Sequence, residues 1–363
     1  MNAAITVIAE AGVNHNGDID RALALVDAAA DAGADVVKFQ TFDPAALATG
    51  GAPQAEYQKH NDGERAGQLA MLQALTLSHR DHHRLMARCG ERGIEFLSSP
   101  FDAGSARFLI DELALPRLKL GSGELTNAPL LLQIARSGRP LILSTGMATP
   151  DEIREALGVL AFGYLGEDRA PSIPAFATAF DHMAGYRVLE RHVTLLHCTT
   201  EYPAPFADLN LRAMDSLRDG FGLAVGFSDH SPGIAMPIAA AARGACVIEK
   251  HFTLDRTLPG PDHRASLEPD ELRAMVDGIR QVELALGDGE KRVADSEAKN
   301  RGVARKSLVA ARPIRAGETF DEHNLTSKRP GDGIPPIHYW ALLGQPARRD
   351  YAADTLIEPG ELW

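Results

Sequence analysis

The stretch VIEKHFTLDRTLPGPDHRASLEP, residues 247–269, joins an apolar run to a loop crowded with charged and imidazole side chains. Burying such groups without partners is costly, so we expect them to be paired, bound to a metal ion or catalytic. Strand side chains alternate between two faces, so Glu249 and His251 share one face and Lys250 points to the other. The pattern predicts a structural ion pair for Lys250 and leaves His251 available for chemistry.

Seven other short apolar runs also end in polar residues that could do chemistry. In chain order these residues are Glu10, Lys38, Gln40, Ser98, Ser99, Lys119, Ser122, Glu124, Ser144, Thr145, His197, Thr199, Thr200, Tyr202, Ser228 and His230. By the period of two, Lys38 shares a strand face with Gln40, and Ser228 shares one in the same way with the histidine at 230. Either lysine, Lys38 or Lys119, could alone be a buried structural ion pair, but together they favour an anion-binding pocket.

The tripeptides SGE at 122–124 and STG at 144–146 place hydroxyl groups and glycines at strand-to-loop turns. Backbone N–H groups in such turns can hold a phosphate group. Each tripeptide alone is a weak signal, since serine and glycine are common in turns. In combination with Lys38 and Lys119, they indicate a substrate that carries phosphate.

His230 and His251 end the last two apolar runs, which would be neighbours in a closed barrel. Two imidazoles there could hold a divalent metal ion in an open site that water or substrate completes. Either histidine alone is more often a structural residue, so the metal hypothesis depends on the pair. Cys198 and Cys246 are expected to be core thiols rather than ligands.

The eight apolar runs alternate with Ala/Leu-rich segments of helical period over residues 1–286. Eight strand-helix units of this size predict an α/β fold, a (β/α)8 TIM barrel, as the catalytic domain. Active sites of such barrels lie at the carboxyl ends of the strands, where the polar residues above are found. A doubly wound open sheet is the alternative, but no G-x-G-x-x-G follows the first strand, which weakens its dinucleotide-binding version.

Two segments interrupt the alternation. Residues 41–76 follow the second strand and are long enough to be an active-site excursion. Residues 163–190 lengthen the connection before the sixth strand and are expected to be surface elaboration. Beyond a charged linker at 287–304, residues 305–363 carry short strand signals and repeated turns, which predict a small separate domain.

Composition bounds the function classes. Of 363 residues, 45% are hydrophobic and 24% are charged, which is typical of a globular protein, and the net charge of −12 argues against a general nucleic-acid binder. Three cysteines without paired spacing favour a reducing compartment. The start MNAAITVIAEAG lacks the basic region of a signal peptide, and no apolar run reaches about 18 residues. We therefore expect a cytoplasmic protein without a membrane span.

Ten short motifs, in order, resemble those of the bacterial sialic acid synthase (N-acetylneuraminate synthase) family. They are AEAGVNHNG, VKFQTF, SSPFD, KLGSGE, LSTGMAT, HCTTEYPAPF, GFSDHS, EKHFTLD, GPDHRASLEP and KRPGDGI. The resemblance covers nearly the whole chain, and its last part looks like the antifreeze-like (SAF) domain of that family. It implies condensation of phosphoenolpyruvate with an open-chain N-acylmannosamine-type sugar, which gives a nine-carbon 2-keto acid and phosphate.

The resemblance also implies roles for the matching residues. They are the catalytic Glu10 and Glu124; the phosphoenolpyruvate ligands Lys38, Lys119, Ser122, Ser144 and Ser228; the sugar ligands Gln40, Tyr202, Asp262 and Arg329; and the metal ligands His230 and His251. The metal would be Mn²⁺ or Mg²⁺, and Arg329 would act from the other subunit of a domain-swapped homodimer. His263 and Arg264 receive no role, and Ser266 is expected to cap the following helix.

Three motifs, AEAGVNHNGD, CTTEYPAPF and GACVIEKHFTLD, look closer to the N,N'-diacetyllegionaminate synthase branch than to the N-acetylneuraminate branch. Two other functions compete with a synthase. A metal-dependent aldolase on a similar barrel would not need two lysines in a phosphate pocket. A catalytically silent sugar-phosphate binding protein would be expected to have lost Glu10 or one of the two histidines.

Overall fold

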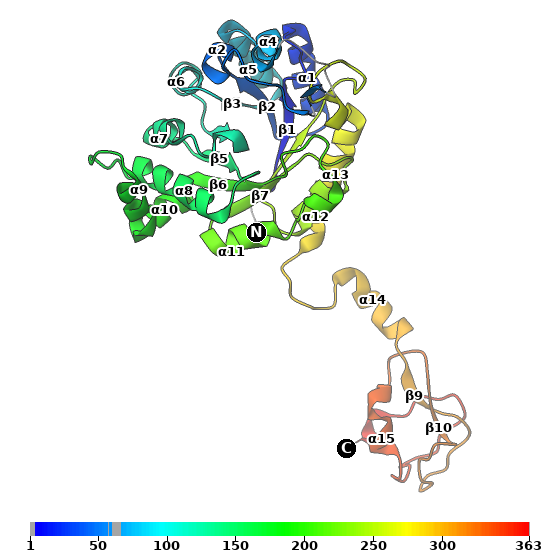
Figure 1. Cartoon of the computed structure of the whole chain (residues 1–363). Helices are drawn as coiled ribbons and strands as arrows, with labels where there is room; N and C mark the ends of the chain where they lie inside the picture. Colours follow the sequence, from blue (N-terminus) through cyan, green and yellow to red (C-terminus); the bar gives the residue numbers. More distant parts are fainter. Residues whose placement is uncertain (1–3, 57, 60–66, 363) are drawn as a thin grey trace. The chain divides into compact units, whose positions relative to one another are not determined.

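The computed structural model describes residues 4–56, 58–59 and 67–362. The chain divides into two compact units, Met1–Gly287 and Asp288–Trp363 (Figure 1). No helix in the described ranges is both long and apolar enough to cross a lipid bilayer.

The first unit is built on a parallel sheet that curls into a barrel (Figure 1). Its strands are β1 (Thr6–Gly12), β2 (Val36–Thr41), β3 (Glu95–Pro100), β4 (Leu118–Leu120), β5 (Leu141–Ser144), β6 (Val193–His197), β7 (Ala224–Asp229) and β8 (Val247–His251). The hydrogen-bonded order is β3-β2-β1-β8-β7-β6-β5-β4, and the two end strands β3 and β4 also pack side by side. The (β/α)8 fold predicted from the alternation is confirmed.

Helices follow the strands and cover the outside of the sheet. They are α1 (Ile19–Asp31), α5 (His79–Arg92), α6 (Ala103–Arg107) with a π-helical turn at Phe108–Glu112, α7 (Ala128–Arg136), α8 (Pro150–Tyr164), α11 (Ala213–Phe221), α12 (Ala235–Ala242) and α13 (Pro269–Leu286). Local sequence fixes their starts: the Asp18 carboxylate caps α1, and Ser78 with Asp81 forms a capping box on α5.

The expected Ser266 cap of α13 is wrong. The helix begins at Pro269, and the Glu271 carboxylate accepts the Glu268 N–H at 2.9 Å. Ser266 is instead held in the preceding loop, because its hydroxyl donates to the Asp262 carbonyl at 2.7 Å.

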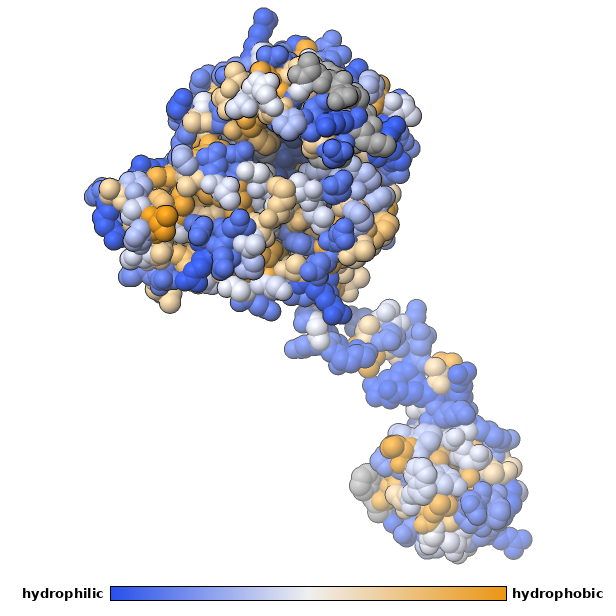
Figure 2. Space-filling model, in the orientation of Figure 1, coloured by the Kyte–Doolittle hydropathy of each residue, from blue (hydrophilic) through white to orange (hydrophobic). Residues whose placement is uncertain are grey.

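The two interruptions have different structures. The excursion at 41–76 contains α2 (Pro44–Leu47) and α4 (Gln68–Leu75), and part of it lies outside the described residues. The insert at 163–190 forms two helices, α9 (Ile173–Asp181) and α10 (Met183–His192), which pack against α8. Apolar residues gather on the surface around α9 (Figure 2), where Ile173 is 80% exposed.

The second unit has its own small core. It contains α14 (Asp295–Ala304), the antiparallel pair β9 (Ser307–Ala310) and β10 (Leu325–Lys328), and α15 (Tyr339–Leu342). Its buried apolar cluster consists of Leu308, Ala310, Ile314, Phe320, Leu325, Ile334, Leu342, Ala347, Tyr351 and Ile357. The helix α14 lies within the charged segment 287–304, which was expected to be a linker.

Candidate active site

The strands stack a polar layer directly above an apolar layer inside the barrel. The apolar layer consists of Ile8, Val36, Leu97, Ile142, Leu196 and Val247. Two residues further along the chain from each of these come Glu10, Lys38, Ser99, Ser144, Cys198 and Glu249. The period of two in a strand turns both sets toward the same interior. The apolar layer closes the barrel below, and the polar layer becomes the floor of a pocket.

This pocket is a cavity of about 310 Å³ at the carboxyl ends of the strands. Every predicted site residue of the first unit lines it, namely Glu10, Lys38, Gln40, Lys119, Ser122, Glu124, Ser144, Tyr202, Ser228, His230, His251 and Asp262. The excursion adds Leu47, Gln58, Gln68, Met71, Leu72 and Leu75. Arg329 belongs to the second unit, where its Nε donates to the Ala304 carbonyl at 3.0 Å. Its role in trans stays a prediction.

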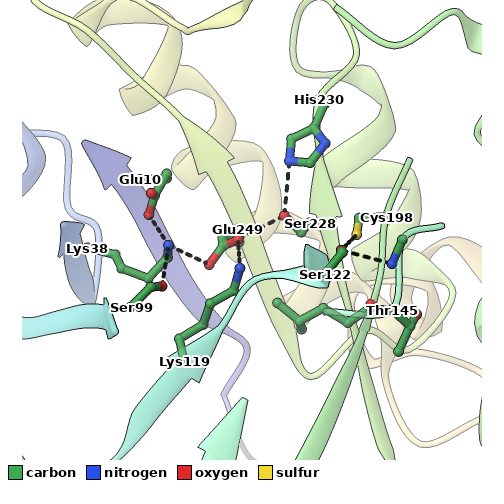
Figure 3. A network of polar contacts seen from close by, with 12 residues as sticks. Glu10, Lys38, Ser99, Lys119, Ser122, Thr145, Cys198, Ser228, His230 and Glu249 are labelled. Atoms are coloured by element: carbon green, nitrogen blue, oxygen red, sulfur yellow. Dashed lines mark hydrogen bonds and ion pairs between the residues drawn. The ribbon is translucent and has the colours of Figure 1, made fainter. Parts of the chain in front are cut away.

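Two lysines and two glutamates form an ion network on the pocket floor (Figure 3). Lys38 pairs with Glu10 and lies 3.6 Å from Oε2 of Glu249. Lys119 Nζ lies 3.2 Å from Oε1 of Glu249, which also accepts the hydroxyl hydrogen of Ser228 at 2.8 Å. Glu249 therefore sits between both lysines and links strands β2, β4, β7 and β8.

The two carboxyls of this network titrate in opposite directions. Burial raises the pKa of Glu10 to about 7, because it outweighs the attraction of Lys38. Burial alone would also raise the pKa of Glu249, but Lys119 and Lys38 lower it to about 2. Burial opposes the charge of Lys38, yet the two glutamates raise its pKa above the ordinary lysine value. Glu249 is thus the permanent anion, and Glu10 can exchange a proton near neutral pH.

His230 and His251 lie side by side at the carboxyl ends of the neighbouring strands β7 and β8, with ring centroids 5.7 Å apart. His230 Nδ1 lies 2.6 Å from the Thr199 carbonyl, so that nitrogen carries the hydrogen and Nε2 keeps its lone pair. Burial lowers the pKa of His230 to about 4 and that of His251 well below the usual histidine value. Tyr202 packs on the His230 ring at 4.1 Å between centroids. Both imidazoles are therefore held neutral.

The free nitrogens of His230 and His251 and the side chains around them decide whether the pair fits a metal ion. Nδ1 of His251 is buried and has no hydrogen-bond partner among the described residues. The described residues hold no group of three or more His, Cys, Asp or Glu side chains arranged around one point. Two neutral nitrogens fit an open site, in which water or substrate supplies the remaining ligands.

Hydroxyl groups line the wall near β4, β5 and β6. Ser122 Oγ accepts the Gly146 N–H at 3.0 Å and lies 3.2 Å from Cys198 Sγ. Ser144 Oγ and Thr200 Oγ1 are buried without a hydrogen-bond partner among the described residues. A Cβ on Gly146 would stand 2.4 Å from the Thr200 hydroxyl oxygen. Position 146 therefore has room only for glycine. The hydroxyl groups of Ser144 and Thr200 remain available to donate to hydrogen-bond acceptors of a ligand.

Two further carboxyls line the pocket. Glu124 is half-buried, and its Oε2 accepts an amide hydrogen of Asn127 at 2.7 Å; burial raises its pKa. Asp262 is buried, and burial raises its pKa to about 6 although Lys38 acts to lower it.

The predicted structural pair of Lys250 is confirmed. Its ammonium group lies 2.6 Å from Oδ2 of Asp229 and also donates to the Ser231 carbonyl. Both charged side chains are fully buried on the outer side of the sheet, away from the pocket.

Sequence reasoning did not select Glu249 as a site residue, although the structure places it at the centre of the ion network. The signal was present, because Glu249 stands two residues before His251 on the same strand face. Ser99 also stands at the end of a strand, and the sequence indicates no role for it. In the structure, Lys38 Nζ lies 3.3 Å from the hydroxyl oxygen of Ser99.

Comparison with known proteins follows the same division of the chain. Residues 25–291 match the NeuB family, and residues 305–362 match the SAF domain. The N,N'-diacetyllegionaminic acid synthase of Campylobacter jejuni is 48% identical over 97% of this chain and 98% of its own length. The enzyme of that name from Legionella pneumophila is 43% identical over 97% of this chain and 92% of its own length.

A solved structure gives the same indication. The N-acetylneuraminic acid (sialic acid) synthetase of Leptospira borgpetersenii superposes with a TM-score of 0.66 at 32% identity. The match covers 82% of this chain and 90% of that one.

Proposed function

This chain belongs to the NeuB family, and from that premise we propose that it makes N,N'-diacetyllegionaminate. The reaction condenses phosphoenolpyruvate with 2,4-diacetamido-2,4,6-trideoxymannose and releases phosphate. The chain is an enzyme of the sialic acid synthase type, since its relatives are synthases of nonulosonic acids. We therefore retain the synthase over the aldolase and the silent binding protein. The two relatives with 48% and 43% identity support the choice of sugar.

The pocket floor supports the phosphoenolpyruvate site, and this is the observation that carries the proposal. Lys38 and Lys119 stand against one permanently ionised carboxylate, Glu249. Glu249 compensates only one of the two ammonium groups, and Glu10, with a pKa of about 7, is ionised in only part of the molecules near neutral pH, so the floor can accept an anionic substrate. The hydroxyls of Ser122, Ser144 and Ser228 lie around this floor and can donate to carboxylate or phosphate oxygens.

The sugar would lie between this floor and the rim, against Gln40, Tyr202 and Asp262. Its aldehyde carbon must meet C3 of phosphoenolpyruvate, where the new carbon–carbon bond forms. Water then adds to C2, and the tetrahedral product loses phosphate by breaking the C–O bond. Lys38 and Lys119, which are both buried, would stabilise the charge of the departing phosphate.

The added water must lose a proton, and Glu10 fits the role of the group that takes it. The Glu10 carboxyl is buried in the floor, and its pKa of about 7 allows exchange at neutral pH. Glu124 also lines the pocket and is a second candidate for proton transfer.

His230 and His251 would hold Mn²⁺ or Mg²⁺, through nitrogens that burial keeps unprotonated. When bound there, such an ion polarises the sugar aldehyde and makes its carbon electrophilic. The protein would orient the rings for this ion. The Thr199 carbonyl and the Tyr202 ring hold the His230 ring in place.

We also propose that the protein is a domain-swapped homodimer in which Arg329 reaches the partner's sugar site. Neither Arg329→Ala nor His251→Ala chains should be active alone. Random mixing of equal amounts makes about half of the dimers hybrids, and one of the two sites in each hybrid is intact, so about a quarter of the activity should return. Hybrids that form and stay inactive would exclude the swapped arrangement.

Phosphate release tests the function directly. The chain should release phosphate from phosphoenolpyruvate with Mn²⁺ and 2,4-diacetamido-2,4,6-trideoxymannose, and less efficiently with N-acetylmannosamine. A preference for N-acetylmannosamine would instead favour an N-acetylneuraminate synthase, as the match to the Leptospira enzyme allows. Release with neither sugar would refute the synthase.

A further inference from the structure

Two motifs have residues without a role in the proposed reaction, NHNG at 14–17 and the part of GPDHRAS that follows Asp262. The first lies in the turn after β1, and the second lies in the loop between β8 and α13. His263 in this loop is fully buried, and Asn14 is 1% exposed. Burial of such polar side chains normally requires partners, so each contact they make has a structural consequence.

The loop is closed at its base by backbone hydrogen bonds. Thr253 N–H donates to the Leu267 carbonyl at 2.8 Å, and Leu267 N–H donates to the His251 carbonyl at 2.9 Å. Asn14, in the turn after β1, strengthens this closure. Its Nδ2 donates both to the Phe252 carbonyl at 2.8 Å and to Ser266 Oγ at 2.9 Å.

His263 then ties the middle of the loop to both sides. Its Nδ1 lies 2.7 Å from Thr253 Oγ1, and its Nε2 lies 3.3 Å from Asn16 Oδ1. An amide oxygen only accepts, so Nε2 carries the hydrogen in the contact with Asn16. Asn16 in turn donates from Nδ2 to the Pro259 carbonyl at 2.7 Å. The imidazole thus joins the start of the loop, at Thr253, to the turn after β1, at Asn16.

Packing reinforces this arrangement. Gly260 has φ of +148°, and a Cβ there would stand 2.7 Å from Cδ2 of His263 and 2.9 Å from Asn16 Oδ1. The loop backbone therefore lies directly on the imidazole ring. The residue before His263 is Asp262, whose carbonyl accepts from Ser266 Oγ at 2.7 Å and whose side chain lines the pocket.

We infer that His263, Asn14 and Asn16 form a clamp that positions Asp262 for the sugar substrate. The clamp residues do not line the pocket, so they act through Asp262 and are positioning residues rather than catalytic ones. The inference rests on the proposed function, since the sugar is the ligand that Asp262 would contact.

The test compares His263→Phe, which fills the space without either hydrogen bond, with His263→Gln, whose amide can still donate to Asn16. In the phosphate-release assay, His263→Phe should raise the KM for the sugar about tenfold and change the KM for phosphoenolpyruvate less than twofold. His263→Gln should recover at least part of the affinity for the sugar. Equal changes in both KM values, or none, would overturn the clamp.

His82 provides a matched control. It is also buried and is hydrogen-bonded through both nitrogens, to Thr41 Oγ1 at 2.8 Å and to the Ser78 carbonyl at 2.9 Å, but it does not line the pocket. His82→Phe should lower the Tm and leave both KM values within about twofold. A rise in the KM for the sugar in this variant would mean that any buried histidine has the same effect, and would refute the inference.

A double-mutant cycle separates positioning from general destabilisation. If His263 acts through Asp262, its effect on the KM for the sugar should fall below about twofold in an Asp262→Asn background. An undiminished effect in that background would refute the inference. Should His263→Phe fail to fold, Asn16→Gly removes the same contact while suiting the positive φ of 52° at that position, and the same pattern is expected. If the wild-type protein is inactive with both sugars, the proposed function itself is refuted. That result is distinct from a change in KM between an active wild type and its variants.

Discussion

Removal of the Lys250 ammonium group should destabilise the barrel without touching the pocket. Lys250→Met keeps most of the side-chain volume and leaves the Asp229 carboxylate buried without its cation. That carboxylate still accepts the Ser231 N–H at 3.0 Å and the Ser231 hydroxyl at 2.7 Å. These neutral donors offset only part of the lost charge, because an uncompensated ion inside a protein is poorly solvated.

The expected size follows from complete burial of the pair, since both side chains are 0% exposed. Loss of one partner of a buried ion pair costs about 3–5 kcal/mol, which for a domain of this size lowers Tm by roughly 5–8 °C. The double variant Lys250→Met with Asp229→Asn should recover more than half of that loss, because the asparagine can keep the Ser231 bonds without a charge. Arg154→Met is the matched surface control, since its pair with Asp181 is 55% and 61% exposed and should matter far less.

The assay can follow the two units separately. Both tryptophans, Trp340 and Trp363, belong to the second unit, so tryptophan fluorescence reports on that unit alone. Far-ultraviolet circular dichroism is dominated by the barrel, which contains most of the helices. Lys250→Met should lower the midpoint of the circular dichroism transition. The reasoning fails if the single variant loses no more stability than Arg154→Met, or if the double variant is less stable than the single one.

Three other predictions concern the pocket. Lys119→Met should raise the KM for phosphoenolpyruvate about 10- to 100-fold, the size of one charge-assisted hydrogen bond, while the sugar KM changes little; an unchanged KM would remove Lys119 from the substrate site. Asp262 has a pKa of about 6 and is charged above it, so the sugar KM should rise as pH falls from 7 to 5, and an Asp262→Asn variant should lose that inflection in steady-state kinetics. Dialysis against a chelator should abolish phosphate release and added Mn²⁺ should restore it, whereas His251→Ala should not be restored; full activity after chelation would refute the metal proposal.

Much of the site could be predicted because it depends on short-range periodicity. The alternation of strand side chains pairs Lys38 with Gln40, Ser228 with His230 and Glu249 with His251 on one strand face, and all six residues line the pocket. The closed barrel then brings the carboxyl ends of all strands together, so residues far apart in sequence converge on one pocket.

The rest depends on register and on competition between local signals. The partners of Glu249 depend on the register between neighbouring strands. In the pairing of β7 with β8, Ser228 stands beside Glu249. No local sequence pattern predicts that register. Ser266 carries a sound capping signal, but Pro269 and Glu271 start the helix later, and the loop uses the serine hydroxyl instead. The insert at 163–190 was expected to be surface elaboration, and its sequence did not indicate that α9 and α10 would pack on α8.

Strand β8 has a consequence for the order in which the protein is assembled. It supplies Glu249 and His251 and is the last strand of the barrel to leave the ribosome. Until it inserts between β1 and β7, Lys38 and Lys119 lack their shared counter-ion and the sheet keeps two open edges. Closure of the barrel and arrival of the Glu249 counter-ion are therefore one event. A nascent chain that stalls before residue 247 would expose both lysines and two unpaired strands, features that chaperones and proteases can recognise.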